Sequence, residues 1–176
     1  MKARKPLPRN AIRTGKVGRN CRNGVVSTPE TIFPQIFKAL PEGFDDLCLE
    51  SLTEGCKPLD RLKADWYSER NRFSMLGEAL FTVLRNNDIV AIGGLNADPY
   101  LGEPGIGWLR HFYVRSRYRR MGIASKLLEY IVEFAEDKFS CLTLPTANPT
   151  AAALNCRHGF VEVVDEKLVT HRLRLG

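Results

Sequence analysis

A short basic turn followed by a helical pattern is the part of this chain best suited to chemistry. Its cations fall within six residues, at Arg115, Arg117, Arg119 and Arg120. The following apolar residues recur every three or four positions, which predicts a helix over residues 120–137. The first N–H groups of a helix lack internal partners and carry the positive end of its dipole. The turn therefore predicts a site for a multiply charged anion such as a pyrophosphate.

Small residues at the start of this helix would let a bulky anion approach the backbone. Gly122 has no side chain, and Ala124 has the next smallest one. The dinucleotide-binding fingerprint needs three spaced glycines, and the P-loop needs glycines followed by Lys and then Ser or Thr. Here Gly122 is the only glycine of the turn, and Ser125 precedes Lys126, so the segment is neither of these loops.

The turn, residues 119–124, reads Arg-x-x-Gly-x-Ala and resembles motif A of the GCN5-related N-acetyltransferase (GNAT) superfamily. In that family the motif binds the pyrophosphate of acetyl-coenzyme A. The resemblance implies an N-acetyltransferase that uses acetyl-coenzyme A as co-substrate and needs no metal. It assigns cofactor contacts to Arg119, Arg120, Met121, Gly122, Ile123, Ala124 and Ser125.

A second segment, residues 148–160, resembles the family pattern Asn-x-x-Ala-x-x-x-Tyr-x-x-x-Gly-Phe. It reads as a short helix capped by Asn148, with Pro149 in the first turn and Gly159 at its end. The family's tyrosine, which protonates the departing thiolate, is replaced by Asn155. An amide does not titrate in the useful range, so Asn155 cannot act as that acid.

The order of the predicted elements extends the resemblance to about residues 35–175. Strands are predicted at residues 35–40, 80–85, 89–95, 105–114, 141–144, 160–164 and 168–173. A mostly helical region, residues 44–67, is broken near Gly55 and Pro58, and residues 86–88 form a hairpin turn. The implied fold is α/β (α+β), a GNAT-like mixed and mostly antiparallel central sheet flanked by helices, with splayed fourth and fifth strands.

In such a fold the pantetheine arm of the cofactor lies between the splayed strands and pairs with a strand edge. By the resemblance, the backbone of Phe112, Tyr113 and Val114 would hold this arm. The Phe112 N–H would then stabilise the oxyanion that develops on the thioester. Asn148 matches the family residue that contacts the pantetheine from the other side.

The general base is less clearly marked. The strand position where some family members carry a carboxylate is Trp108. His111 is the candidate base because its intrinsic pKa is suitable, and Glu103 and Asp98 are nearby alternatives. Trp108 and Arg110 alternate onto one strand face, where a core Trp and a surface Arg are the simplest interpretation.

Length and composition favour one compact domain, residues 31–176, behind a basic tail, residues 1–30. The chain has 176 residues, 44% of them hydrophobic, and a net charge of +6. Eight Lys or Arg precede the first acid, Glu30, so the remaining residues carry a net charge of −2, the difference between +6 and +8. The tail is expected to be disordered. It could be an inert extension, an organelle-targeting peptide or a nucleic-acid arm.

No apolar run approaches the roughly 18 residues of a membrane span, so a soluble, cytoplasmic protein without a membrane partner is expected. The five cysteines lack metal spacing and are expected to be reduced. The predicted acceptor is a primary amine of a small molecule, which attacks the thioester directly in a ternary complex; the acyl chain and a homodimer are left open. Asn155 supports an alternative, a non-catalytic acyl-coenzyme A-binding or regulatory domain. A third alternative is a nucleic-acid binder, although no aromatic residues alternate with the charges of the tail.

Overall fold

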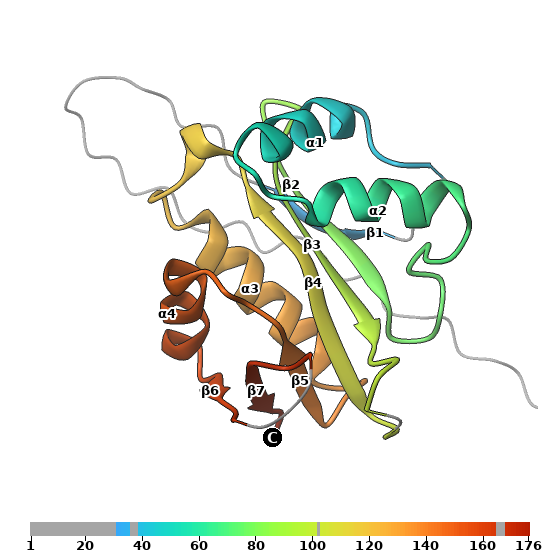
Figure 1. The fold of residues 1–176 in the computed structure, drawn as a ribbon, viewed down its shortest axis with the longest axis vertical. Helices are drawn as coiled ribbons and strands as arrows, with labels where there is room; N and C mark the ends of the chain where they lie inside the picture. The colour runs from blue at the N-terminus through green and yellow to red at the C-terminus, as the bar shows by residue number, and fades with distance from the viewer. Residues whose placement is uncertain (1–30, 36–38, 102, 165–167) are drawn as a thin grey trace, which may run out of the picture.

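A seven-stranded sheet forms the centre of the molecule (Figure 1). The computed structural model describes residues 31–35, 39–101, 103–164 and 168–176. The strands are β1 (Thr31–Gln35), β2 (Ala79–Arg85), β3 (Asp88–Ala97), β4 (Ile106–Val114), β5 (Cys141–Leu144), β6 (Val161–Glu162) and β7 (His171–Arg174). Their order across the sheet is β1-β2-β3-β4-β5-β7-β6, with β4 and β5 parallel and the other neighbours antiparallel. The predicted mixed, mostly antiparallel sheet is confirmed, whereas the predicted tail, residues 1–30, lies outside the described residues.

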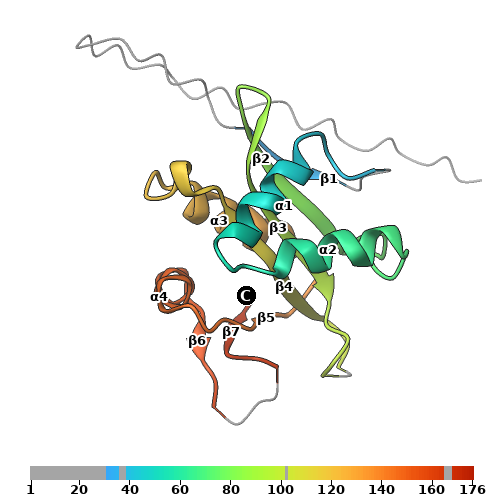
Figure 2. The same ribbon diagram turned by 45° about the horizontal axis from the view of Figure 1, so that its top comes forward.

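Within the described residues, four helices cover the two faces of this sheet. They are α1 (Phe44–Thr53), α2 (Pro58–Tyr67), α3 (Ile123–Ala135) and α4 (Pro149–Arg157), and a 3-10 turn, η1 (Ser116–Tyr118), precedes α3. Figure 1 shows α1 and α2 together over one face of β2, β3 and β4. Helix α3 packs against the opposite face of the same strands. Figure 2 shows α4 beside the short strand β6, away from α1 and α2.

The first two helices begin and end where the sequence predicts. Phe44, Leu47, Cys48 and Ser51 form the buried face of α1. Their spacing of three and four residues is that of an amphipathic helix. Pro58 occupies the first turn of α2, where its missing N–H costs nothing. The helical region 44–67 is thus two helices broken between residues 53 and 58, as predicted.

Strand β1 and helix α3 begin at other residues than predicted. The first strand is Thr31–Gln35 rather than residues 35–40. It pairs with β2 at the edge of the sheet, where Pro34 is tolerated because one side of an edge strand makes no ladder bonds. Helix α3 begins at Ile123 rather than at residue 120. Arg120 and Gly122 have positive φ angles, 59° and 80°, which the α-helix does not allow.

The last two strands are shorter than the sequence indicates. The predicted strand over residues 160–164 contracts to β6, which has two residues, and the one over residues 168–173 shifts to β7. Residues 165–167 of their connection lie outside the described part of the chain. The strand pair therefore exists, but its apolar runs are longer than its paired segments.

Strands β4 and β5 pair over three residues and then separate. The paired positions are Ile106 with Cys141, Gly107 with Leu142, and Trp108 with Thr143. Beyond Trp108, β4 continues for six residues, of which Leu109, Arg110, Tyr113 and Val114 pair with β3. The predicted splaying of the fourth and fifth strands is confirmed, since their parallel pairing ends at Trp108 and Thr143.

Candidate active site

The splayed edge of β4 is the first part of the candidate site. From Leu109 to Val114, no described strand pairs with the side of β4 that faces β5. An exposed strand edge offers its N–H and C=O groups to an extended ligand, which can pair with it as an added strand would. Phe112, Tyr113 and Val114, the predicted pantetheine contacts, all lie on this edge. Their role in binding stays a prediction.

A bulge changes the direction of β4 in the middle of this edge. Ile92 pairs with Tyr113 and Gly94 with Arg110, so His111 and Phe112 together stand opposite Gly93. His111 adopts a left-handed conformation, with a φ of 56°. A bulge leaves one residue out of the ladder and re-aims its neighbours. The Phe112 N–H, the predicted oxyanion donor, is therefore part of an irregular segment and not of a regular ladder.

The start of α3 is the second part. Its N-cap, Gly122, has a φ of 80° and no side chain with which to bind the first free N–H groups of the helix. A Cβ atom built on Gly122 would have no heavy atom of the described residues within 4 Å. The space beside this backbone is therefore open to a ligand, and the N–H groups and helix dipole suit an anion.

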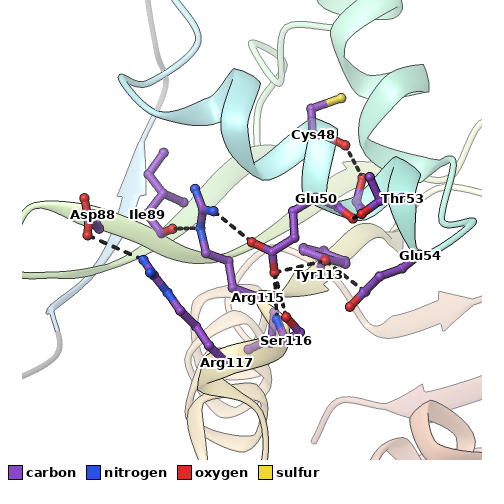
Figure 3. Close-up of polar contacts among 12 residues, drawn as sticks. Cys48, Glu50, Thr53, Glu54, Asp88, Ile89, Tyr113, Arg115, Ser116 and Arg117 are labelled. Atoms are coloured by element: carbon purple, nitrogen blue, oxygen red, sulfur yellow. Dashed lines mark hydrogen bonds and ion pairs between the residues drawn. The ribbon is translucent and has the colours of Figure 1, made fainter.

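Most of the basic turn is occupied by protein contacts. Arg115 donates to a carboxylate oxygen of Glu50 at 2.8 Å and to the carbonyl oxygen of Ile89 at 2.7 Å (Figure 3). Arg119 forms an ion pair with Glu54, and its Nε donates to the Val114 carbonyl oxygen at 3.0 Å. These two arginines therefore hold the turn in place with their side chains.

The other two arginines are more exposed. Arg117 stacks on the Tyr118 ring and lies 3.7 Å from an Asp88 carboxylate oxygen. Arg120 is exposed and makes no hydrogen bond or ion pair with the residues that the structure describes. Arg120 is thus the arginine of this turn that is best placed to neutralise a bound phosphate.

The acids of α1 were missed by the sequence reasoning. One Glu50 carboxylate oxygen accepts the Ser116 N–H at 2.8 Å and the Ser116 hydroxyl at 3.2 Å. Burial opposes ionisation of Glu50, but the hydrogen bonds from Ser116 and Arg115 hold its pKa below the usual range. Glu50 and Glu54 are four residues apart on one helix face. This spacing indicates that the two acids point the same way, but nothing in the sequence pairs them with a turn about 65 residues away.

Tyr113 joins the same network. Its hydroxyl donates to Glu54 at 2.9 Å and lies 3.5 Å from Glu50. Burial, together with this bond to Glu54, raises the pKa of Tyr113 above its usual value. The side chain therefore anchors β4 to α1, and the backbone of Tyr113 is what remains for a ligand.

His111, the candidate base, is buried against α2. Its Nδ1 lies 2.7 Å from the Pro58 carbonyl oxygen, so this nitrogen carries the proton and donates it. Burial, with the neighbouring Arg110 charge second, lowers the pKa of His111 to about 3. Nε2 has no hydrogen-bond partner among the described residues. His111 is therefore neutral at pH 7 and links the bulge of β4 to the start of α2.

Of the two alternative bases, Asp98 is held by hydrogen bonds within the protein. One Asp98 oxygen accepts the N–H groups of Tyr100 and Leu101, and the other accepts the Thr143 hydroxyl at 2.9 Å. Glu103 is exposed. The Asp98 carboxylate thus organises the turn after β3 and connects it to β5.

Trp108 is a core residue, 7% exposed, but Arg110 is not the surface residue expected. The Arg110 side chain is 15% exposed, lies over the Trp108 ring and is 3.5 Å from an Asp65 carboxylate oxygen of α2. Two ties, His111 to Pro58 and Arg110 to Asp65, therefore hold α2 against this face of β4.

The second predicted motif forms α4. The Asn148 side chain accepts the N–H groups of Thr150 and Ala151 at 2.9 and 3.4 Å, which confirms it as the helix cap. Asn148 is exposed, so its amide nitrogen stays available to a ligand. Asn155 is the buried residue of this helix. The cofactor contact predicted for Asn148 stays a prediction.

The described residues contain neither a membrane-spanning helix nor a cluster of metal ligands. Among the described residues, no helix is both long and apolar enough to cross a membrane. The same part of the chain contains no group of three or more His, Cys, Asp or Glu side chains arranged to hold a metal ion.

Comparison with known proteins identifies the family. Residues 45–160 match the family model described as acetyltransferase (GNAT) family. A structure from Exiguobacterium sp. 255-15, described as an acetyltransferase, is 27% identical over 84% of this chain and 94% of its own, with a TM-score of 0.72.

Two further structures share the fold. A GNAT-family acetyltransferase from Staphylococcus aureus Mu50 is 16% identical over 84% of this chain and all of its own, with a TM-score of 0.61. A ribosomal-protein-alanine N-acetyltransferase from Brucella melitensis is 22% identical over 82% of this chain and 99% of its own, with a TM-score of 0.60. The splayed β4 edge, the uncapped start of α3 and the match over residues 45–160 lead to one conclusion: this chain belongs to the GNAT family of acetyltransferases.

Proposed function

We propose that this protein transfers an acetyl group from acetyl-coenzyme A to a primary amine of a small molecule, which attacks the thioester directly in a ternary complex. The observation that carries the proposal is continuity: the unpaired edge of β4 leads through one short turn into the uncapped start of α3. An extended arm that ends in a pyrophosphate matches both features at once. Acetyl-coenzyme A supplies the activated acetyl thioester.

In this proposal the protein binds the co-substrate mainly through its backbone. The edge residues Phe112, Tyr113 and Val114 pair with the pantetheine, and the Asn148 amide contacts it from α4. The N–H groups that follow Gly122 bind the pyrophosphate, and Arg120 adds a positive charge. The open space at Gly122 and the exposed Asn148 support these assignments.

Two groups of β4 would act on the reaction. The Phe112 N–H, re-aimed by the bulge, stabilises the oxyanion, which removes much of the barrier without any titrating residue. His111 is the candidate for taking up the amine proton, and its neutral state at pH 7 is the form that a base needs. Its low pKa makes it a weak base, so we assign most of the rate to positioning and to the oxyanion donor.

The acceptor side of β4 supports a small acceptor. Helix α2 is fastened over this face by the Arg110 bond to Asp65 and the His111 bond to Pro58. Because α2 is tied to this face, we propose a small molecule rather than a polypeptide as the carrier of the acceptor amine.

The first test is thermal unfolding of the full chain with acetyl-coenzyme A, coenzyme A, ATP or a short DNA duplex at matched ionic strength. A ligand at about a hundred times its Kd adds roughly 2.7 kcal/mol of stability. For a domain of this size, that corresponds to a rise in Tm on the order of 5–10 °C. We expect the rise with the two coenzyme A forms, followed by thiol release when a panel of small amines is added. A rise with DNA alone would overturn the proposal.

Asn155 supports a second candidate, an acyl-coenzyme A-binding domain with little or no turnover. It stands where the family has its acid, and an amide cannot protonate the departing thiolate. This candidate predicts the same rise in Tm with coenzyme A but no thiol release with any amine. The two readouts of the first test therefore separate the candidates.

A further inference from the structure

We propose that Glu50 of α1 is a positioning residue for the turn that binds the pyrophosphate, residues 115–122. The inference rests on the proposed function, because it concerns how the co-substrate is held. Glu50 lies 3.5 Å from the Tyr113 hydroxyl of β4 but makes no contact with the start of α3. It acts through Arg115 and Ser116, the two residues with which the turn begins (Figure 3).

The contacts of Glu50 are directed at the backbone of the turn. One carboxylate oxygen accepts the Ser116 N–H at 2.8 Å, and Ser116 is the first residue of η1. The other oxygen lies 2.8 Å from Nη1 of Arg115. A carboxylate that accepts the first N–H of a helical turn stabilises that turn as a capping side chain does. Here the cap comes from a residue 66 positions earlier in the chain.

The ion pair is largely shielded from water. The Arg115 and Glu50 side chains are 13% and 23% exposed. Arg115 is also held by β3, because its Nε donates to the Ile89 carbonyl oxygen and its N–H donates to that of Val90. Removing the carboxylate would leave the Arg115 charge half-buried without its partner and free the Ser116 N–H. The turn would then lose its support at this end.

The other end of the turn is fixed differently. Ile123, the first residue of α3, is buried in the core on the opposite face of the sheet. Residues 116–122 therefore span two anchors, the core contact of Ile123 and the Glu50 carboxylate. A backbone site for an anion needs its N–H groups held in place before the ligand arrives. Glu50 supplies the anchor at the start of the turn, and the Arg119 ion pair with Glu54 supports its middle.

The test compares Glu50→Gln with Asp45→Asn in the full chain. Asp45 is on the same helix and forms a 3.0 Å ion pair with Lys63, but it does not touch the turn. Each variant is titrated with acetyl-coenzyme A and with S-acetylpantetheine, which has the thioester and the pantetheine arm but no pyrophosphate. We expect Glu50→Gln to raise the Kd for acetyl-coenzyme A about tenfold, and its Kd for S-acetylpantetheine to stay at the wild-type value.

Asp45→Asn should bind both ligands as the wild type does. Failure of the wild type to bind acetyl-coenzyme A would overturn the proposed function and this inference with it. A wild type that binds, beside a Glu50→Gln variant with the same Kd, would overturn the role of Glu50 alone. Equal losses for both ligands would show a general structural role instead. If Glu50→Gln does not fold, Arg115→Gln removes the other half of the ion pair. This variant must then show a raised Kd for acetyl-coenzyme A and an unchanged Kd for S-acetylpantetheine.

Discussion

The carboxyl end of β4 and the face of β4 that packs against α2 use charged residues in different ways. At the end, Arg115 and Arg119 are held by acids of α1, and the groups left open to a ligand belong to the backbone. On the face, His111 and Arg110 are side chains whose partners come from α2. The first region is a backbone site braced by side chains, and the second is assembled from side chains of several elements.

This difference decides which region a sequence motif can describe. A backbone site needs a particular conformation over a few consecutive residues, and small residues such as Gly122 record it locally. A site assembled from separate elements has no such local record. The predictions below test this contrast, first at the backbone site and then at the face.

The largest effect is expected at Gly122. Gly122→Ala places a methyl group where the pyrophosphate is proposed to lie, and overpacking of this kind costs about 1–3 kcal/mol. We therefore expect the Kd for acetyl-coenzyme A to rise by up to about a hundredfold. Titration calorimetry measures it.

Gly43→Ala is the matched control. Gly43 is the N-cap of α1, has a φ of 78°, and likewise has no described heavy atom within 4 Å of a built Cβ. Both substitutions should cost about 1–2 kcal/mol of stability through left-handed strain. Equal Kd values for the two variants would contradict the backbone site.

The next effect concerns the buried face and depends on pH. Because the pKa of His111 is lowered from 6.5 to about 3, the unfolded chain binds more protons than the folded one between these values. The contribution of neutral His111 is fully present above pH 6.5 and is lost as the pH falls. The free energy of unfolding should fall by about 2 kcal/mol between pH 7 and pH 5 for this reason.

His111→Asn tests this, because Asn tolerates the left-handed conformation of the bulge. The variant should be less stable than the wild type at pH 7 but should lose less stability on acidification. Urea unfolding at pH 7 and pH 5 measures how much stability each protein loses on acidification. Equal losses in the wild type and the variant would mean that His111 is not the buried neutral group described above.

A third effect is expected at Asn155. Asn155→Tyr restores a phenol at the family's acid position and should raise kcat with an accepted amine about tenfold, below the usual range for acid catalysis because Asn155 is buried and a larger ring must be accommodated. Asn155→Phe carries the same ring without the hydroxyl and should not raise kcat. A gain in both variants would trace the effect to packing rather than to proton transfer.

The smallest effect separates two arginines of the basic turn. Arg120→Gln should raise the Kd for acetyl-coenzyme A about fivefold, since one charge-assisted contact of about 1 kcal/mol is lost. Arg117→Gln removes an exposed partner of Asp88 and should leave the Kd unchanged. The ratio of the two Kd values should approach one at high salt. Similar losses in both variants would favour a diffuse field over a specific contact.

The sequence predicted the fold through local signals. The spacing of apolar residues located α3, and Gly55 and Pro58 marked the break between α1 and α2. Asn86 and Asn87, both with positive φ, formed the predicted hairpin turn between β2 and β3. The sequence misplaced β1, because the apolar run at residues 36–37 looked more like a strand than the segment that pairs with β2. An edge strand is chosen by its partner as much as by its own composition.

The candidate site was predictable to the extent that it is local. Gly122 and the helix after it could be identified from residue type and spacing. The arginines of the turn were identified, but their pairing, Arg115 with Glu50 and Arg119 with Glu54, was not. The cofactor contact predicted for Arg119 stays a prediction. Arg110 was taken for a surface residue because its partner, Asp65, lies 45 positions earlier. Such pairs depend on the topology, which no single segment contains.

The three-residue contact between β4 and β5 also bears on how the chain folds. It joins two antiparallel ribbons, β1–β4 and β5–β7. In the first ribbon, the consecutive strands β2, β3 and β4 pair through two hairpins. Local pairings of this kind form early, whereas a parallel pairing waits for its crossover helix, here α3. The slot between the ribbons is thus expected to close after the hairpins of β2, β3 and β4 have formed, and the residues that line it come together only then.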